Sequence, residues 1–170
     1  MNYAGAGLIV LSPDCSSLLL VHDARSGKWG FPKGHRETDD TSDLDTAIRE
    51  CREETGLTLD DYLVNPSVFK ISKGSQSYLF RYAIMKDDGG CWRYKLQSGP
   101  SYEIADLRWV PIRALLDATQ VLDGNKYLRT WISDIQNNIS KKSVYLFRAI
   151  ATRLLPSQEA MSPSNIIACA

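Results

Sequence analysis

The sequence predicts a single α/β domain. Two observations favour this class. Apolar runs of strand length alternate along the chain with stretches in which apolar residues recur every three or four positions, as on one face of a helix. The 170 residues also suit one domain with its own core. We expect this domain to cover residues 1–155. The Ser-, Pro- and Ala-rich stretch at 156–170 is expected to be a flexible tail.

Composition excludes several classes of protein. Apolar residues make up 44% of the chain and charged residues 24%, which is ordinary for a globular domain. The formal net charge is zero, so there is no global attraction to nucleic acid or membrane. No apolar run is long enough to cross a bilayer, and no basic residue precedes Arg25, so the charged start of a secretory signal is missing.

The cysteines indicate a reducing compartment. They are far apart and form no Cys-x-x-Cys pair, at Cys15, Cys51, Cys91 and Cys169. This spacing argues against a zinc site and for reduced thiols inside a cell. We therefore expect the protein in the cytoplasm, with the nucleus as an alternative.

The chain begins with two predicted strands that form a hairpin. Ala4 to Leu11 is a small-then-aliphatic run, Pro13-Asp14 makes a turn, and Leu18 to His22 is the second strand. A basic loop follows with Arg25, Lys28 and Lys33. These cations either contact substrate phosphates or are simply solvated.

The stretch from Gly34 to Leu57 predicts a helix with an acidic face. Apolar side chains recur at helical intervals, whereas three glutamates fall together on another face: Glu50, Glu53 and Glu54. Asp43 or Asp45 is expected to cap the start of the helix, and Gly56 to end it in a left-handed conformation.

The three glutamates repel one another unless a cation lies between them. Carboxylate oxygens are the ligands that Mg2+ and Mn2+ prefer, commonly together with substrate phosphates. Arg49 lies one turn before Glu53 and is able to hold a carboxylate through two hydrogen bonds. The alternative is a solvated acidic face, which is common on exposed helices.

The order of residues in this stretch resembles the Nudix box. The run from Arg49 to Leu57, Arg-Glu-Cys-Arg-Glu-Glu-Thr-Gly-Leu, fits the second half of that motif, and Gly34 fits its start. The first half departs from the pattern, because Gly34 lies one residue too far from Arg49 and no Glu occupies the expected place. We expect Asp40 or Asp39 to replace that Glu and to pair with Arg49.

Further strands are predicted after the box. They cover Tyr62 to Ile71, Ser77 to Met85 and Trp92 to Leu96. Alternation places Tyr78, Phe80 and Tyr82 on one face of the second strand. Tyr78 and Tyr82 either stack on a nucleobase or pack within the sheet.

The segment from Glu103 to Pro111 is expected to end a strand in Trp-Val-Pro. By resemblance to the family, Glu103 is expected to complete the metal site or to act as the base, with Asp106 as a substitute.

Three helices are predicted in the C-terminal part, over Ile112 to Asp117, Asn125 to Ile139 and about Ser140 to Leu155. The last is basic, with Lys141, Lys142, Arg148 and Arg153 and no acid between Lys141 and Leu155. It is either a packed terminal helix with a solvated face or a contact for a phosphate backbone.

The resemblance implies an α/β/α sandwich with a mixed central sheet and a metal-dependent hydrolase. The implied reaction splits a nucleoside diphosphate from another group, with Mg2+ or Mn2+ as cofactor. The implied metal ligands are Glu50, Glu53, Glu54, Glu103 and the carbonyl of Gly34, with Arg49 orienting the carboxylates.

Box context favours mRNA 5′-cap decapping as the reaction. Diadenosine-polyphosphate and diphosphoinositol-polyphosphate hydrolysis are the alternatives within the enzyme class. A catalytically inactive nucleotide-binding module is the alternative outside it. Retention of all three box glutamates and Arg49 disfavours the inactive module.

Overall fold

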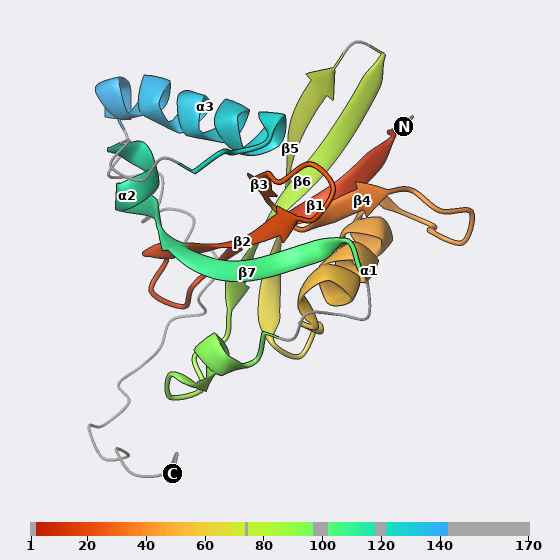
Figure 1. Ribbon diagram of the computed structural model, residues 1–170, viewed down its shortest axis with the longest axis horizontal. Coiled ribbons are helices and arrows are strands. Elements are labelled where there is room, and N and C mark those ends of the chain that lie inside the picture. Colours follow the sequence, from red (N-terminus) through yellow and green to blue (C-terminus); the bar gives the residue numbers. More distant parts are fainter. Residues whose placement is uncertain (1–2, 74, 97–101, 118–121, 143–170) are drawn as a thin grey trace.

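The computed structural model describes residues 3–73, 75–96, 102–117 and 122–142. The described strands form a seven-stranded mixed sheet in the order β3-β2-β1-β6-β5, with β4 paired to β1 and β7 paired to β2 (Figure 1). The strands are β1 (Gly5–Leu11), β2 (Ser17–Asp23), β3 (Trp29–Gly30), β4 (Lys33–His35), β5 (Tyr62–Lys73), β6 (Gln76–Met85) and β7 (Ile104–Pro111). The helices are α1 (Asp43–Thr55), the 3-10 turn η1 (Cys91–Tyr94), α2 (Ile112–Leu116) and α3 (Lys126–Lys142).

Helices cover both faces of the sheet, which gives the predicted α/β/α sandwich. One buried cluster contains Leu20, Phe80 and Trp131 and joins the sheet to α2 and α3. A second cluster contains Leu8, Leu19 and Cys51 and lies between the sheet and α1. Figure 1 shows α1 and α3 on opposite sides of the central strands. The acidic helix is therefore held on one face by an apolar core of its own.

β1 is the central strand, and its glycines bring the box loop close to the sheet. It pairs in parallel with β6 and in antiparallel with β4. A Cβ at Gly5 would lie 2.1 Å from the carbonyl oxygen of Gly34, and one at Gly7 would lie 2.4 Å from that of Pro32. Both distances are far shorter than any side chain tolerates. Because Gly5 and Gly7 have no side chains, the β4 backbone is able to pack directly against β1. This packing positions Gly34 beside α1.

The apolar stripe of α1 is confirmed, and its N-terminal cap is a correction. Ala47, Cys51 and Thr55 are buried. The cap is Ser42, whose hydroxyl accepts a hydrogen bond from the backbone of Asp45, rather than Asp43 or Asp45. Gly56 ends the helix with φ of 77°, in the left-handed conformation that glycine adopts without strain.

Most of the remaining predicted elements are confirmed. The first two strands pair as an antiparallel hairpin with Leu11 opposite Leu18. The predicted strand at Trp92 to Leu96 is wrong, because Cys91–Tyr94 form a 3-10 turn and the Trp92 ring is buried edge-on against Trp109. The third C-terminal helix lies mostly outside the described residues, and α3 continues without a break to Lys142. Among the described residues, no helix is long and apolar enough to span a bilayer.

Candidate active site

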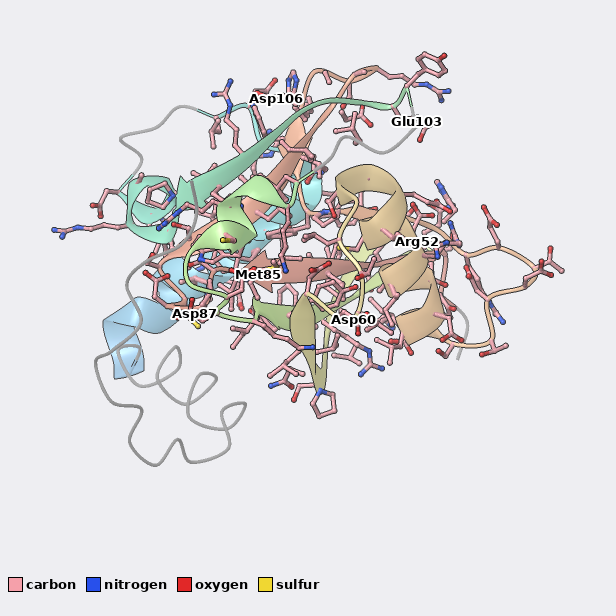
Figure 2. All side chains as sticks on the ribbon, turned by 90° about the horizontal axis from the view of Figure 1, so that it is seen from below. Arg52, Asp60, Met85, Asp87, Glu103 and Asp106 are labelled. Atoms are coloured by element: carbon pink, nitrogen blue, oxygen red, sulfur yellow. The ribbon has the colours of Figure 1, made fainter. Side chains whose placement is uncertain are left out.

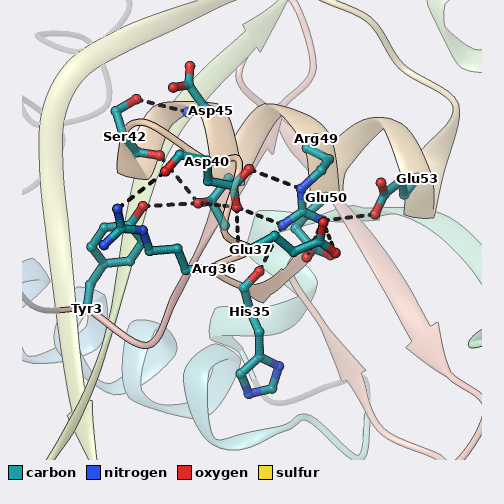
Figure 3. A network of polar contacts seen from close by, with 11 residues as sticks. Tyr3, His35, Arg36, Glu37, Asp40, Ser42, Asp45, Arg49, Glu50 and Glu53 are labelled. Carbon is teal, nitrogen blue, oxygen red and sulfur yellow. Dashed lines mark hydrogen bonds and ion pairs between the residues drawn. The ribbon is translucent and has the colours of Figure 1, made fainter.

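Arg49 is the centre of the polar face of α1. Its guanidinium donates to the carboxylates of Asp40 at 2.9 Å, Glu50 at 2.8 Å and Glu53 at 3.1 Å, and to the carbonyl of His35 at 2.8 Å (Figure 3). The arginine side chain is only 16% exposed, so water competes weakly for these bonds. Arg49 thus joins the loop before the helix to two of the three box glutamates and fixes the direction of their carboxylates.

Asp40 is the residue that replaces the missing glutamate. Its two carboxylate oxygens accept from Arg49 Nε and Nη2, and one of them also accepts from the Thr46 hydroxyl and the Glu37 backbone. The Arg49 guanidinium holds the pKa of this buried carboxyl well below its usual range. Asp39, the other candidate, is exposed. The prediction that Asp40 or Asp39 pairs with Arg49 is confirmed for Asp40.

Glu50 packs directly on the backbone of Gly34. A Cβ at Gly34 would lie 2.1–2.2 Å from the carboxyl carbon and oxygens of Glu50. The glutamate side chain is 13% exposed. Loss of hydration raises its pKa, against the opposing effect of Arg49. The box therefore begins with a glycine because any side chain at Gly34 would occupy the space of the Glu50 carboxylate.

Glu54 lies in a desolvated position near Glu50. Its Oε2 accepts a hydrogen bond of 2.9 Å from the backbone N–H of Lys33. Burial raises the pKa of the Glu54 carboxyl to about 8, and the charge of Glu50 adds to this, whereas the charge of Lys33 opposes it. Glu54 is thus a carboxyl group whose proton is exchanged near neutral pH.

The donor chemistry of this cluster fits a divalent cation. Glu50, Glu53, Glu54 and the carbonyl of Gly34 are hard oxygen ligands of the kind that Mg2+ and Mn2+ select. The raised pKa values of Glu50 and Glu54 indicate carboxylates that lack sufficient compensating charge. Within the described ranges, there is no group of three or more Asp, Glu, His or Cys side chains that are already close enough to hold a metal ion together. Arg49 holds one carboxylate oxygen each of Glu50 and Glu53.

A pocket opens beside Glu54. It encloses about 250 Å3, which is near the lower end of the volumes that hold small ligands. Three lysines from different segments line it, Lys28, Lys33 and Lys126, together with two acidic side chains, Asp23 and Glu54. An anionic group close to the carboxylate cluster is the ligand that this arrangement favours. The predicted phosphate contacts Lys28 and Lys33 both line the pocket, whereas Arg25 does not.

Sequence reasoning missed the wall of the pocket that α3 supplies. Asn125, Lys126 and Tyr127 form it. The position of Asn125 just before a helical run is a typical cap signal, but nothing in the local sequence places this helix start beside Glu54. The tertiary fold brings them together.

The two predicted substrate tyrosines lie in different environments. Tyr78 is 5% exposed, and its ring lies 4.9 Å from that of Tyr127, with the Lys33 ammonium 5.8 Å from the Tyr78 ring centre. Tyr82 is partly buried and packs against the core, and its hydroxyl accepts a hydrogen bond from Trp131 Nε1. Tyr127, rather than Tyr82, is the tyrosine that lines the pocket.

Glu103 lies at the tip of β7 (Figure 2). Its side chain is 60% exposed and is 3.5 Å from Arg25 Nη2, in an exposed pair of small energetic value. Its carbonyl accepts from the backbone of Ala24. Asp106 pairs with Arg108 on the same strand. Neither acid forms a contact with the box glutamates in the described structure, so the metal or base role of Glu103 stays a prediction.

The predicted RNA-binding cations cannot be placed in the structure. Arg148 and Arg153 lie outside the described residues. The backbones of Lys141 and Lys142 belong to the last turn of α3, but their side chains are not described.

Comparison with known proteins identifies relatives over most of the chain. The family model for the NUDIX domain matches residues 1–132. An uncharacterized 17.7 kDa protein of Enterobacteria phage T4 is 36% identical over 92 residues, which cover 49% of this chain and 61% of the phage protein. The m7GpppN-mRNA hydrolase dcap-2 of Caenorhabditis elegans is 30% identical over 169 residues, which cover 92% of this chain and 21% of that enzyme. The chain therefore spans only part of the length of these relatives.

Solved structures share the fold. A crystal structure of a C. elegans Ap4A hydrolase binary complex superimposes with a TM-score of 0.57 at 21% identity, covering 84% of this chain and 97% of that one. At this identity the likeness establishes a common architecture.

Proposed function

The chain belongs to the Nudix hydrolase family, and on that premise we propose that it is a divalent-metal-dependent pyrophosphohydrolase that acts on the capped 5′ end of mRNA. The observation that carries the metal-dependent chemistry is that two of the box glutamates lie against one backbone segment, Lys33 and Gly34. Glu54 accepts from the N–H of Lys33, and Glu50 lies against Gly34. The carboxylates are thus assembled beside a pocket lined with lysines.

Bound at Glu50, Glu53, Glu54 and the Gly34 carbonyl, a cation would supply Lewis acidity and lower the pKa of an attacking water. The side chains of the protein supply the rest. Arg49 orients Glu50 and Glu53. Lys28, Lys33 and Lys126 bind the phosphates. Burial raises the pKa of Glu54 to about 8 in the metal-free protein, and a cation bound beside it would favour the ionised carboxylate.

Decapping is favoured over other substrates by two considerations. The similarity to the worm decapping enzyme extends along 92% of the chain, and the box stretch resembles that branch of the family. The pocket also encloses only about 250 Å3, so that most of an RNA chain would lie outside it. We propose that Lys141, Lys142, Arg148 and Arg153 contact the RNA backbone.

Diadenosine tetraphosphate is the second candidate, and inositol pyrophosphates are a third. The Tyr127 ring lines the pocket beside Lys33 and favours a nucleotide, whose base is able to stack, over an inositol, which has no aromatic ring.

A substrate panel with product identification tests the proposal. Capped RNA, free cap dinucleotide, diadenosine tetraphosphate and an inositol pyrophosphate are incubated with the protein and Mg2+ or Mn2+. We expect release of a 7-methylguanosine diphosphate from capped RNA. Turnover of diadenosine tetraphosphate under conditions that leave capped RNA intact would assign the second candidate instead.

A further inference from the structure

Asn125 combines two roles that are separable by mutation. It is the residue before α3, and its Oδ1 accepts a hydrogen bond of 3.0 Å from the backbone N–H of Leu128, which caps the helix. Of the two polar atoms of the amide, only the oxygen is able to accept from an N–H. The other atom is therefore Nδ2, which is a donor. Within the described structure, no hydrogen bond to Nδ2 is formed by another residue. The Asn125 side chain lines the pocket beside Glu54.

The backbone of Asn125 is locked to the sheet. Its N–H donates to the carbonyl of Trp29 at 2.7 Å, and its carbonyl accepts from Arg129 at 3.0 Å. The preceding residue, Gly124, forms a bridge with Trp29 as well. A side chain anchored in this way at both its backbone and its Oδ1 loses little freedom when its amide group binds a ligand.

Gly30 provides the space for the amide. A Cβ at Gly30 would lie 1.9 Å from Asn125 Nδ2 and 2.8 Å from the amide carbon. Gly30 is buried in β3. Its backbone is not in the left-handed conformation, so that conformation is not the reason for a glycine at this position. The close approach to Asn125 explains it: any side chain at position 30 would push the amide out of its place in the pocket wall.

We propose that Asn125 is a substrate-positioning residue whose Nδ2 donates a hydrogen bond to a phosphate oxygen of the substrate. Lys28, Lys33 and Lys126 line the same pocket, so the group that enters it is anionic. The amide adds a directional donor to these mobile cations and fixes the orientation of the phosphate chain relative to Glu54. This inference rests on the proposed pyrophosphohydrolase activity for its catalytic readout.

The Asn125→Asp variant separates the two roles. Aspartate caps a helix as well as asparagine does, so the melting temperature should stay the same. It replaces the donor with a negative charge that repels phosphate. We expect KM for the best substrate of the panel to rise about tenfold to a hundredfold with little change in kcat, because a hydrogen bond to a charged group is lost. Asn125→Ser, which keeps the cap and shortens the side chain, should show a smaller rise. Equal KM values for wild type and Asn125→Asp would overturn the inference.

Gly30→Ala supplies the matched test of geometry. The added methyl group displaces the long amide of Asn125 but leaves room for a serine. Gly30→Ala should therefore raise KM strongly with Asn125 present and much less in the Asn125→Ser background. Additive effects of the two substitutions would contradict the inferred contact.

A binding measurement separates this inference from the proposed activity. Inorganic pyrophosphate is titrated calorimetrically into metal-free protein, so that no turnover occurs. Weaker binding to the uncharged Asn125→Ser variant than to wild type supports the inference even if no member of the panel is hydrolysed. Failure of wild type to bind pyrophosphate, or equal affinities of the two proteins, overturns it whatever the panel shows.

Discussion

Arg49 and Asp40 meet in a two-pronged hydrogen bond, with Nε 3.2 Å from Oδ1 and Nη2 2.9 Å from Oδ2. The planar guanidinium matches a carboxylate in this geometry and leaves Nη1 free to bind Glu50 and Glu53. Arg49 therefore links the loop at Asp40 to two carboxylates of the acidic face. The loop between Gly34 and Arg49 is one residue longer than in the family motif, and the buried Asp40 still reaches Arg49.

Asp40→Asn should lower kcat about tenfold to a hundredfold, which is the usual cost of losing a partner that orients a ligand. The amide offers one acceptor instead of two, so Arg49 would hold Glu50 and Glu53 less firmly. Steady-state kinetics at saturating Mg2+ measure the effect. Asp39→Asn serves as the control and should leave kcat unchanged, since Asp39 is exposed. A larger loss for Asp39 than for Asp40 would contradict the assignment.

Removal of the metal or of its ligands should abolish turnover while the fold is kept. We expect activity to vanish in chelator and to return with Mg2+ or Mn2+. The double variant Glu53→Gln, Glu54→Gln should lose orders of magnitude in kcat because neutral amides bind hard cations poorly. Circular dichroism would show an unchanged fold. Full activity of the double variant, or in chelator, would exclude a metal at this cluster.

Glu54→Gln alone should stabilise the metal-free protein at neutral and alkaline pH. The folded protein raises the pKa of Glu54 from 4.5 to about 8, so folding favours the protonated carboxyl. Ionisation therefore costs stability increasingly as pH rises from about 4.5 toward about 8, and the full cost persists above that range. Glutamine resembles the neutral form and avoids this cost, and its oxygen still accepts from Lys33.

Thermal unfolding in chelator at about pH 5 and about pH 8.5 measures this effect. The melting temperature of Glu54→Gln should exceed that of wild type, by more at the higher pH. A Glu53→Gln variant is the control, because Glu53 is 45% exposed and its carboxylate is well hydrated. A difference that shrinks with rising pH would show that Glu54 is not desolvated.

Gly34→Ala should damage the site more than the fold. The new Cβ would lie 2.1 Å from the Glu50 carboxyl carbon, and this flexible end of the side chain is able to move aside. We expect a small change in melting temperature and at least a tenfold loss of kcat/KM, since displacement of a catalytic group by about 1 Å is costly. Combining Gly34→Ala with Glu50→Gln tests the cause. Losses that add fully would show that the two positions act independently.

The sequence predicts α1 well because its signals are local. The apolar stripe through Ala47 and Cys51, the stop at Gly56 and the acidic face all follow from helical periodicity and turn chemistry. The partner of Arg49 was also predictable, because the family motif requires a carboxylate there and only two aspartates lie within reach of the expected place. Burial decides between them in favour of Asp40.

The parts that the sequence does not predict depend on tertiary contacts. Trp92 to Leu96 has the aromatic character of a strand, but the Trp92 ring packs against Trp109, and the segment forms a 3-10 turn instead. The pocket wall at Asn125 is about 70 residues beyond Glu54 in sequence and is held near it by tertiary contacts such as the hydrogen bond to Trp29. No local pattern reports such a juxtaposition.

The choice between capped RNA and diadenosine tetraphosphate is expected to follow salt and substrate length. Each lysine or arginine that neutralises an RNA phosphate releases a counterion, so affinity for capped RNA should fall steeply as salt is added. Capped RNA should also be cleaved far better than free cap dinucleotide. Neutralising Lys141, Lys142, Arg148 and Arg153 should abolish that preference and leave hydrolysis of small substrates intact.

Lys28→Ala is the matched comparison for these substitutions. Lys28 lines the pocket, so its loss should raise KM for small and large substrates alike. If diadenosine tetraphosphate is the preferred substrate, the C-terminal cations should matter little, and Tyr127, the tyrosine that lines the pocket, should matter more. Retention of the length preference after all four C-terminal charges are removed would place the RNA contact elsewhere on the protein, with the pocket lysines as the next positions to test.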